Sequence, residues 1–127
     1  MLIADPRPTV RAAVAATLDA EPGVTVVGSV GAFDEVIAGV RGHRPHVMLL
    51  DLAVLGGRRM TGLAALRRMD PSTAVLVMGV VEDPALAHAL LRNGAAGRIM
   101  KDAPAAELGA AVRAAARRGR HLRIVPS

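Results

Sequence analysis

The sequence of 127 residues contains no cysteine, tryptophan or tyrosine, and Phe33 is its only aromatic residue. Without cysteine the chain forms neither disulfides nor thiolate metal sites. No apolar run approaches the roughly 18 residues that a membrane-spanning helix needs. Residues 1–4 also lack the basic segment that precedes the apolar stretch of a signal peptide. We therefore expect a cytoplasmic protein without membrane contacts.

Positive charge is abundant, with a net charge of +5, but lysine is nearly absent: Lys101 is the only one among 16 basic residues. Excess positive charge is compatible with binding to nucleic acid. The arginines, however, are spread along the whole chain, and the aromatic residues that stack on bases are lacking. We expect no direct binding of DNA by this chain. The single lysine is notable because a compact ammonium cannot be replaced by the wide fork of arginine.

Short apolar runs alternate with stretches in which apolar residues recur at helical spacing. The runs, at residues 2–4, 24–27, 47–50, 75–78 and 98–100, predict five strands. The helical stripes comprise Val10, Val14 and Leu18; Phe33, Val36, Ile37 and Val40; Leu63, Leu66 and Met69; Leu86, Leu90 and Leu91; and Leu108, Val112 and Ala115. Such alternation predicts one α/β domain, a doubly wound parallel sheet covered by helices on both faces.

Local signals mark the ends of the later helices. Asp83-Pro84 predicts a helix start with aspartate as N-cap, and Asn93-Gly94 predicts its end. Pro104 opens the last helix, which we expect to end at Gly119. The domain therefore spans residues 1–120, and residues 121–127 are predicted to be a tail or the start of a linker.

Charged residues follow three of the predicted strands. Asp5 follows the first, Asp51 the third and Lys101 the fifth, while Gly79 follows the fourth. Each alone is compatible with an ordinary helix cap or a surface charge. The carboxyl ends of parallel strands, however, meet at one edge of the sheet, where ligands and chemistry gather. Two carboxylates and one ammonium at that edge predict a functional site.

Three segments carry a resemblance to a known family. They are Leu2-Ile3-Ala4-Asp5 with Pro8 and Val10-Arg11, then Val47 to Leu52 around Asp51, and Gly94-Ala95-Ala96-Gly97 with Lys101-Asp102-Ala103-Pro104. Over nearly all of residues 1–120 the chain resembles response-regulator receiver domains, most closely those of the NarL/FixJ type, which carry a DNA-binding helix-turn-helix after the receiver. The resemblance implies a flavodoxin-like (βα)5 sheet with strand order 2-1-3-4-5.

The resemblance also implies a chemistry for the sheet edge. Asp51 stands at the phosphoacceptor position, where an aspartate attacks a phosphoryl group and forms an acyl phosphate. Asp5, Asp51 and the backbone carbonyl of Ala53 stand where the family binds Mg²⁺. Lys101 would pair with the phosphoryl charge. A hydroxyl residue after strand four and an aromatic residue in strand five would then carry the signal to the output face.

The chain departs from this pattern at several positions. Pro6 stands where the family has a second acid that binds Mg²⁺ directly, and Gly79 stands where it has the switch hydroxyl. Arg98 replaces the strand-five aromatic residue. The loop after Asp51 reads Leu55-Gly56 where proline and glycine are common, followed by an apparent insertion among residues 57–60. Together these changes predict a degenerate phosphorylation site and weak or lost Mg²⁺ binding.

We therefore predict an atypical receiver that controls transcription through an attached DNA-binding domain, independently of phosphorylation at Asp51. Arg7, Arg58 or Arg59 would pair with Asp5 or Asp51 in the place of Mg²⁺. The predicted partners are a histidine kinase and a second copy of the chain, and DNA is bound only through the output domain. The dimer face would include Leu86, Leu90, Arg98, Ala110 and Arg113.

Three alternatives remain open from the sequence. The first is a ligand-sensing receiver, because Gly79 leaves space where small molecules bind in such sheets. The second is a stand-alone module that docks other proteins, and the third is a conventional receiver that accepts phosphate weakly. No motif positions a general base, so an enzyme acting on an external substrate is not expected.

Two other features suggest no site. The histidines at positions 43, 46, 88 and 121 lack the spacing of a metal centre, and we expect His43 and His46 to be exposed in a turn. Gly56-Gly57 lacks the remainder of a phosphate-binding loop.

Overall fold

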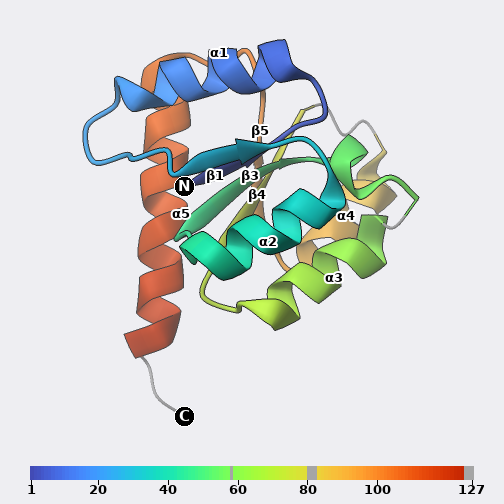
Figure 1. Cartoon of the computed structure of the whole chain (residues 1–127). Coiled ribbons are helices and arrows are strands. Elements are labelled where there is room, and N and C mark those ends of the chain that lie inside the picture. The colour runs from blue at the N-terminus through green and yellow to red at the C-terminus, as the bar shows by residue number, and fades with distance from the viewer. Residues whose placement is uncertain (58, 80–82, 125–127) are drawn as a thin grey trace.

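A five-stranded parallel sheet in the order β2-β1-β3-β4-β5 forms the centre of the computed structural model, which describes residues 1–57, 59–79 and 83–124 (Figure 1). The strands are β1 (Leu2–Ala4), β2 (Gly28–Val30), β3 (Val47–Asp51), β4 (Ala74–Met78) and β5 (Ala95–Ile99). The helices are α1 (Pro8–Asp19), α2 (Phe33–His43), α3 (Arg59–Met69), α4 (Pro84–Arg92) and α5 (Ala105–Ile124), with a 3₁₀ turn, η1, at Leu52–Leu55. The predicted fold class and strand order are confirmed.

Each face of the sheet carries its own hydrophobic core. Alternate residues of β1 illustrate this, since Leu2 and Ala4 pack with α2, α3 and α4, whereas Ile3 packs with α1 and α5. Leu63 and Leu90 belong to the first core, and Leu108 belongs to the second. Burial on both faces accounts for the continuous apolar runs of β3 and β4. No helix in the described part of the chain is both long and apolar enough to span a bilayer.

The predicted signals at the ends of α4 are confirmed. The Asp83 side chain accepts a hydrogen bond from the backbone N–H of Ala85 at 2.9 Å, and Pro84 occupies the first turn. Asn93 is the C-cap, and Gly94 follows with φ of 105°. The predicted inward stripe is wrong at Leu91, which is 57% exposed, while Leu90 is buried.

The predicted second strand is wrong in position. Residues 24–27 are extended but outside the sheet, and β2 begins at Gly28, which pairs with Leu2. In this parallel register Met1 lies opposite Val27. Its carbonyl accepts a hydrogen bond from the N–H of Val27 at 2.8 Å, and its amino group donates to the carbonyl of Thr25 at 2.8 Å. Val24 and Val26 instead pack against the core beneath α1 and α5. Val24 and Val26 are half-buried and Thr25 and Val27 are exposed, so the run alternates as a strand does, although it lies outside the ladder.

Two other boundaries differ from prediction. β5 covers Ala95–Ile99 and not residues 98–100, because pairing with the buried strand β4 overrides the low strand propensity of alanine and glycine. The last helix does not end at Gly119 but continues to Ile124, so most of the predicted tail is helical.

Candidate functional site

Asp5 lies at the carboxyl end of β1 and is completely buried. Its backbone N–H continues the pairing with β2 by donating to the carbonyl of Val30 at 3.1 Å. Its carboxylate turns back over the β1–α1 connection, where Oδ1 accepts the backbone N–H of Arg7 at 2.9 Å. This Asx-type turn is a common local preference of aspartate. It places a charged side chain in the interior, which is costly unless it is paired.

Asp51 is the last residue of β3, and its carboxylate is 15% exposed. It also acts as the N-cap of η1, since Oδ1 accepts the backbone N–H of Ala53 at 2.7 Å. The neighbouring strands β1 and β3 thus bring the Asp5 and Asp51 carboxylates to the same edge of the sheet, as the sequence predicts.

Lys101 follows β5 and joins the two carboxylates. Its ammonium donates to Oδ2 of Asp5 at 2.8 Å and also to Oδ2 of Asp51. The Lys101 side chain is 22% exposed. A compact ammonium can bridge two carboxylate oxygens that converge at one point, which is a physical reason for lysine in a chain otherwise rich in arginine.

Arg7 supplies a second cation. Its Nε lies 3.3 Å from Oδ1 of Asp5, and its Nη2 lies 3.4 Å from Oδ2 of Asp5 and 3.5 Å from Oδ2 of Asp51. The structure thus places Arg7 where the sequence analysis expects a charge partner. Arg58, and the side chain of Arg59, lie outside the described residues.

The charges of this cluster balance. Asp5 and Asp51 contribute two negative charges, and Lys101 and Arg7 contribute two positive charges. Burial raises the pKa of the Asp5 carboxyl, but hydrogen bonds from Lys101 and Arg7 outweigh burial and hold this pKa below its ordinary value. The pKa of Arg7 is raised by its hydrogen bond to Asp5. Both carboxylates are therefore stabilised by cations belonging to the protein.

Arg11 is a further site residue that the sequence analysis missed. Its Nη1 donates to the backbone carbonyl of Asp5 at 2.8 Å. A side chain at Gly31 would interfere, because a Cβ there would lie 2.4 Å from Nη1 of Arg11. Arg11 thus lies across Gly31 and fixes the backbone that carries Asp5. Val10-Arg11 is one of the segments that resemble the receiver family, and this is the only sequence feature that draws attention to Arg11. A side chain that contacts a backbone carbonyl has no recognisable sequence motif.

The residues present do not fit a Mg²⁺ site. Pro6 has no side-chain oxygen, and the carboxylate oxygens of Asp5 and Asp51 face nitrogen donors. The carbonyl of Ala53 accepts the N–H of Gly56 at 3.2 Å within η1. Over the described ranges, no three carboxylate or imidazole side chains are grouped as metal ligands. Mg²⁺ prefers an octahedral set of oxygens, which this arrangement does not offer.

Gly79 has φ of 108°, a conformation that residues with side chains rarely adopt. A Cβ at this position would lie 3.9 Å from Cε of Lys101, so space is available and backbone strain is the obstacle. A hydroxyl residue would need a different backbone here. The conformation of the chain after β4 therefore favours glycine at position 79.

The residues of the predicted dimer face differ in exposure, and Leu90 is a core residue that is only 3% exposed. Leu86 and Leu90 lie on α4, Arg98 is exposed on β5, and Ala110 is exposed on α5. Arg113 does not belong to this face. Its guanidinium donates to the carbonyl of Pro22 at 3.0 Å and lies 3.8 Å from Glu21, which places it beside the end of α1.

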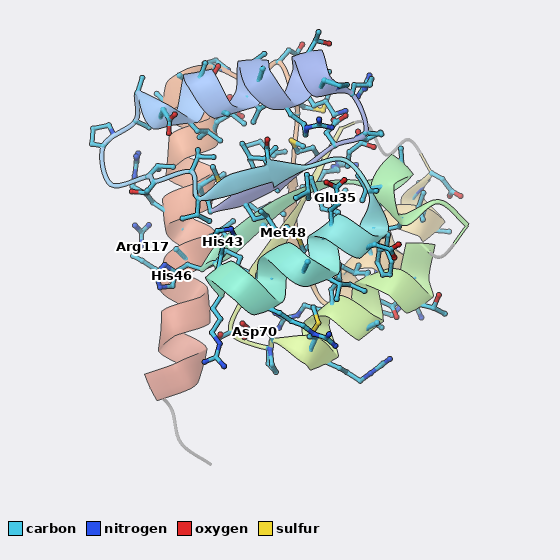
Figure 2. The ribbon with its side chains drawn as sticks, in the orientation of Figure 1. Glu35, His43, His46, Met48, Asp70 and Arg117 are labelled. Carbon is cyan, nitrogen blue, oxygen red and sulfur yellow. The ribbon has the colours of Figure 1, made fainter. Side chains whose placement is uncertain are left out.

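His43, His46 and His88 are exposed, and the side chain of His121 lies outside the described residues. Figure 2 shows His43 and His46 at the connection between α2 and β3, in a view that also labels Arg117 of α5. This connection leads into the amino end of β3, at the opposite end of the strand from Asp51.

Comparison with known proteins agrees with this fold. The family model of the response regulator receiver domain matches residues 1–113. The oxygen regulatory protein NreC of Staphylococcus haemolyticus is 32% identical over 116 residues, which cover 89% of this chain and 52% of that protein. The transcriptional regulatory protein NarL of Mycobacterium tuberculosis is 31% identical over 112 residues, which cover 88% and 52%. The chain therefore spans about half the length of these relatives.

Solved structures agree as well. The signal receiver domain of NarL from Mycobacterium tuberculosis is 30% identical, with a TM-score of 0.82, and the match covers 91% of this chain and 94% of that one. The isolated receiver domain of RcsB from Salmonella enterica serovar Typhimurium is 26% identical, with a TM-score of 0.78, and the match covers 89% and 84%.

Proposed function

Because the chain belongs to the response regulator receiver domain family, we propose that it is an atypical receiver whose conformation does not depend on phosphorylation of Asp51. One observation carries the proposal: the Arg7 guanidinium reaches both Asp5 and Asp51, beside the ammonium of Lys101. These two cations supply the positive charge that Mg²⁺ would supply in a conventional receiver.

The arrangement also opposes attack by Asp51 on a phosphoryl donor. Of its two carboxylate oxygens, Oδ1 accepts the N–H of Ala53, and Oδ2 contacts Lys101 and Arg7. An oxygen that accepts charge-assisted hydrogen bonds is a weaker nucleophile, because its electron pairs are stabilised. Gly79 supplies no hydroxyl that could respond to a phosphoryl group.

The output of this receiver is proposed from its relatives. NarL and NreC are named as regulatory proteins, and the match to this chain covers only 52% of each of them. We therefore propose that the domain acts in transcriptional control through an attached DNA-binding domain. We also propose a histidine kinase as its partner. It acts as a signalling domain and turns over no external substrate.

Incubation with a small acyl phosphate donor and Mg²⁺, followed by intact-mass measurement, tests the proposal. We expect no gain of a phosphoryl group in the wild-type protein, because Asp51 is held by Lys101 and Arg7 and lacks a Mg²⁺ site. The Asp51→Asn variant controls for modification elsewhere. A gain in the wild type that is absent from Asp51→Asn would contradict the proposal and identify a conventional receiver that accepts phosphate weakly.

We further propose a homodimer through α4 and β5. A groove of about 310 Å³ lies between these elements, lined by residues that include Leu90, Ala95 and Gly97. Leu91, which also lines the groove, is 57% exposed, and Met100, which follows β5, is 42% exposed. Exposed apolar side chains around a groove are typical of interfaces between proteins.

Sedimentation velocity tests the dimer with a matched pair of variants. Leu91→Glu should shift the protein to monomer, because a charge would be buried in the interface. Val27→Glu also introduces a charge at an exposed apolar residue, but beside the opposite edge strand, and should leave the dimer intact. A wild-type protein that stays monomeric at high concentration would exclude the dimer.

A further inference from the structure

A cavity of about 370 Å³ lies at the end of the sheet opposite to Asp51. It is formed where the segment before β2, the connection from α2 to β3 and helix α5 meet. Its apolar wall comprises Met1, Val24, Val27, Val47, Val112 and Ala116. This volume is in the range of small-molecule sites in proteins.

The ionisable side chains that line the cavity all carry nitrogen. His43, Arg44 and His46 line it from a single connection, and no aspartate or glutamate is among the lining residues. The nearby acids have other partners: Glu21 pairs with Arg113, and Asp70 accepts hydrogen bonds from the N–H and hydroxyl of Ser72. Arg44 also interacts electrostatically with Asp70, and its positive charge offsets part of the negative charge of Asp70. The lining therefore offers nitrogen hydrogen-bond donors, with the Arg44 guanidinium as their fixed positive charge, beside an apolar wall.

The backbone at Arg44 gives a second, independent observation. Arg44 is the C-cap of α2 with φ of 46° and ψ of 57°, and among the described residues it is the only one other than glycine with positive φ. Glycine is preferred at such a position because it adopts left-handed angles without a steric penalty. An arginine at a position of backbone strain points to a use for its side chain.

We propose that this cavity binds a small organic carboxylate. The carboxylate group would be held by His43, Arg44 and His46, and the apolar part of the ligand would pack against Val24, Val47 and Val112. The site lies at the amino ends of the strands, away from the edge where the sequence analysis placed a ligand pocket beside Gly79. It is independent of the acidic cluster, so the proposed function can fail without affecting this inference.

Benzoate is a suitable probe because it combines a carboxylate with an apolar ring. In ¹H–¹⁵N spectra of the whole chain at constant ionic strength, benzoate should cause saturable shifts confined to the amides of residues 23–27, 43, 44, 46, 47 and 112–116, which surround the cavity. Benzyl alcohol, which keeps the ring without the charge, should cause at least fivefold smaller shifts. Shifts that do not saturate, that are spread over the surface, or that are equal for both compounds would overturn the proposal.

Variants of the lining residues separate binding from folding. Arg44→Gly should weaken benzoate binding at least fivefold while its melting temperature stays at or above the wild-type value, because glycine suits the left-handed backbone. The variant carrying both His43→Gln and His46→Gln should weaken binding to a similar extent. Arg41→Ala is the matched control, since Arg41 is on the same helix but lines a different groove, between α2 and α3. Unchanged affinity in Arg44→Gly and in the double variant would overturn the proposal.

Discussion

The free energy of unfolding of the Lys101→Met variant should be about 3 kcal/mol lower than that of the wild type, since breaking a buried ion pair from one side leaves a charge without its partner. Asp5 is completely buried, and Lys101 is the less exposed of its two cationic partners, at 22% compared with 57% for Arg7. Arg7 would remain, but exposed ion pairs contribute little, at most about 1 kcal/mol. For a domain of this size, the melting temperature should fall by roughly 10 °C.

Urea unfolding followed by circular dichroism measures this effect. Arg92→Met is the matched control, because it removes a cation from the exposed end of α4, away from the acidic cluster. Its free energy of unfolding should stay within about 0.5 kcal/mol of the wild type. If Lys101→Met proved as stable as Arg92→Met, Lys101 would not be stabilising the buried carboxylate of Asp5.

The second large effect should be a gain of Mg²⁺ binding in the double variant Pro6→Asp with Arg7→Ala. This variant adds a carboxylate beside Asp5 and removes the guanidinium that reaches both Asp5 and Asp51. Three carboxylates and one ammonium carry excess negative charge, which a divalent cation offsets. With a dissociation constant of about 1 mM, 20 mM Mg²⁺ would stabilise the variant by about 2 kcal/mol. Its melting temperature should then rise by roughly 6 °C.

Thermal melts with and without Mg²⁺, at matched ionic strength, measure the gain. The variant Pro6→Ala with Arg7→Ala lacks only the added carboxylate, and its melting temperature should respond little, as should that of the wild type. A wild-type response equal to that of the Pro6→Asp, Arg7→Ala variant would show that Arg7 does not replace the metal.

The sheet was predictable because its signals are local. The apolar runs of β3 and β4 and the cap at Asp83 follow from burial and from backbone hydrogen bonding, which act within a few residues. The position of β2 was not predictable, because residues 24–27 have the composition of a strand, and the pairing of Gly28 with Leu2 is a long-range contact that leaves no local signal. The exposure of Leu91 likewise depends on how α4 packs.

The acidic cluster was predictable to a similar degree. Parallel strands bring Asp5, Asp51 and Lys101 together in any fold of this topology, so their convergence follows from the order of strands. The role of Arg7 was expected as one of three candidates, and a contact as specific as that of Arg11 with the Asp5 carbonyl requires coordinates. The prediction that Arg113 belongs to the dimer face was wrong, because its side chain contacts Glu21 and the carbonyl of Pro22 near the end of α1. These contacts join residues far apart in the sequence.

The free energy of unfolding of Asp51→Asn tests the central claim most directly, with Asp83→Asn as control. Each aspartate side chain accepts a hydrogen bond from the backbone N–H two residues further along the chain, and an asparagine side chain can accept the same bond. Within the part of the chain that the structure describes, Asp51 also pairs with Arg7 and Lys101, whereas Asp83 has no such cation. If Arg7 and Lys101 neutralise the site in the place of Mg²⁺, Asp51→Asn should lose about 1–2 kcal/mol, because the amide cannot pair with either cation. Asp83→Asn should change little. A gain in stability for Asp51→Asn would mean that excess negative charge persists at the site, and it would contradict the account.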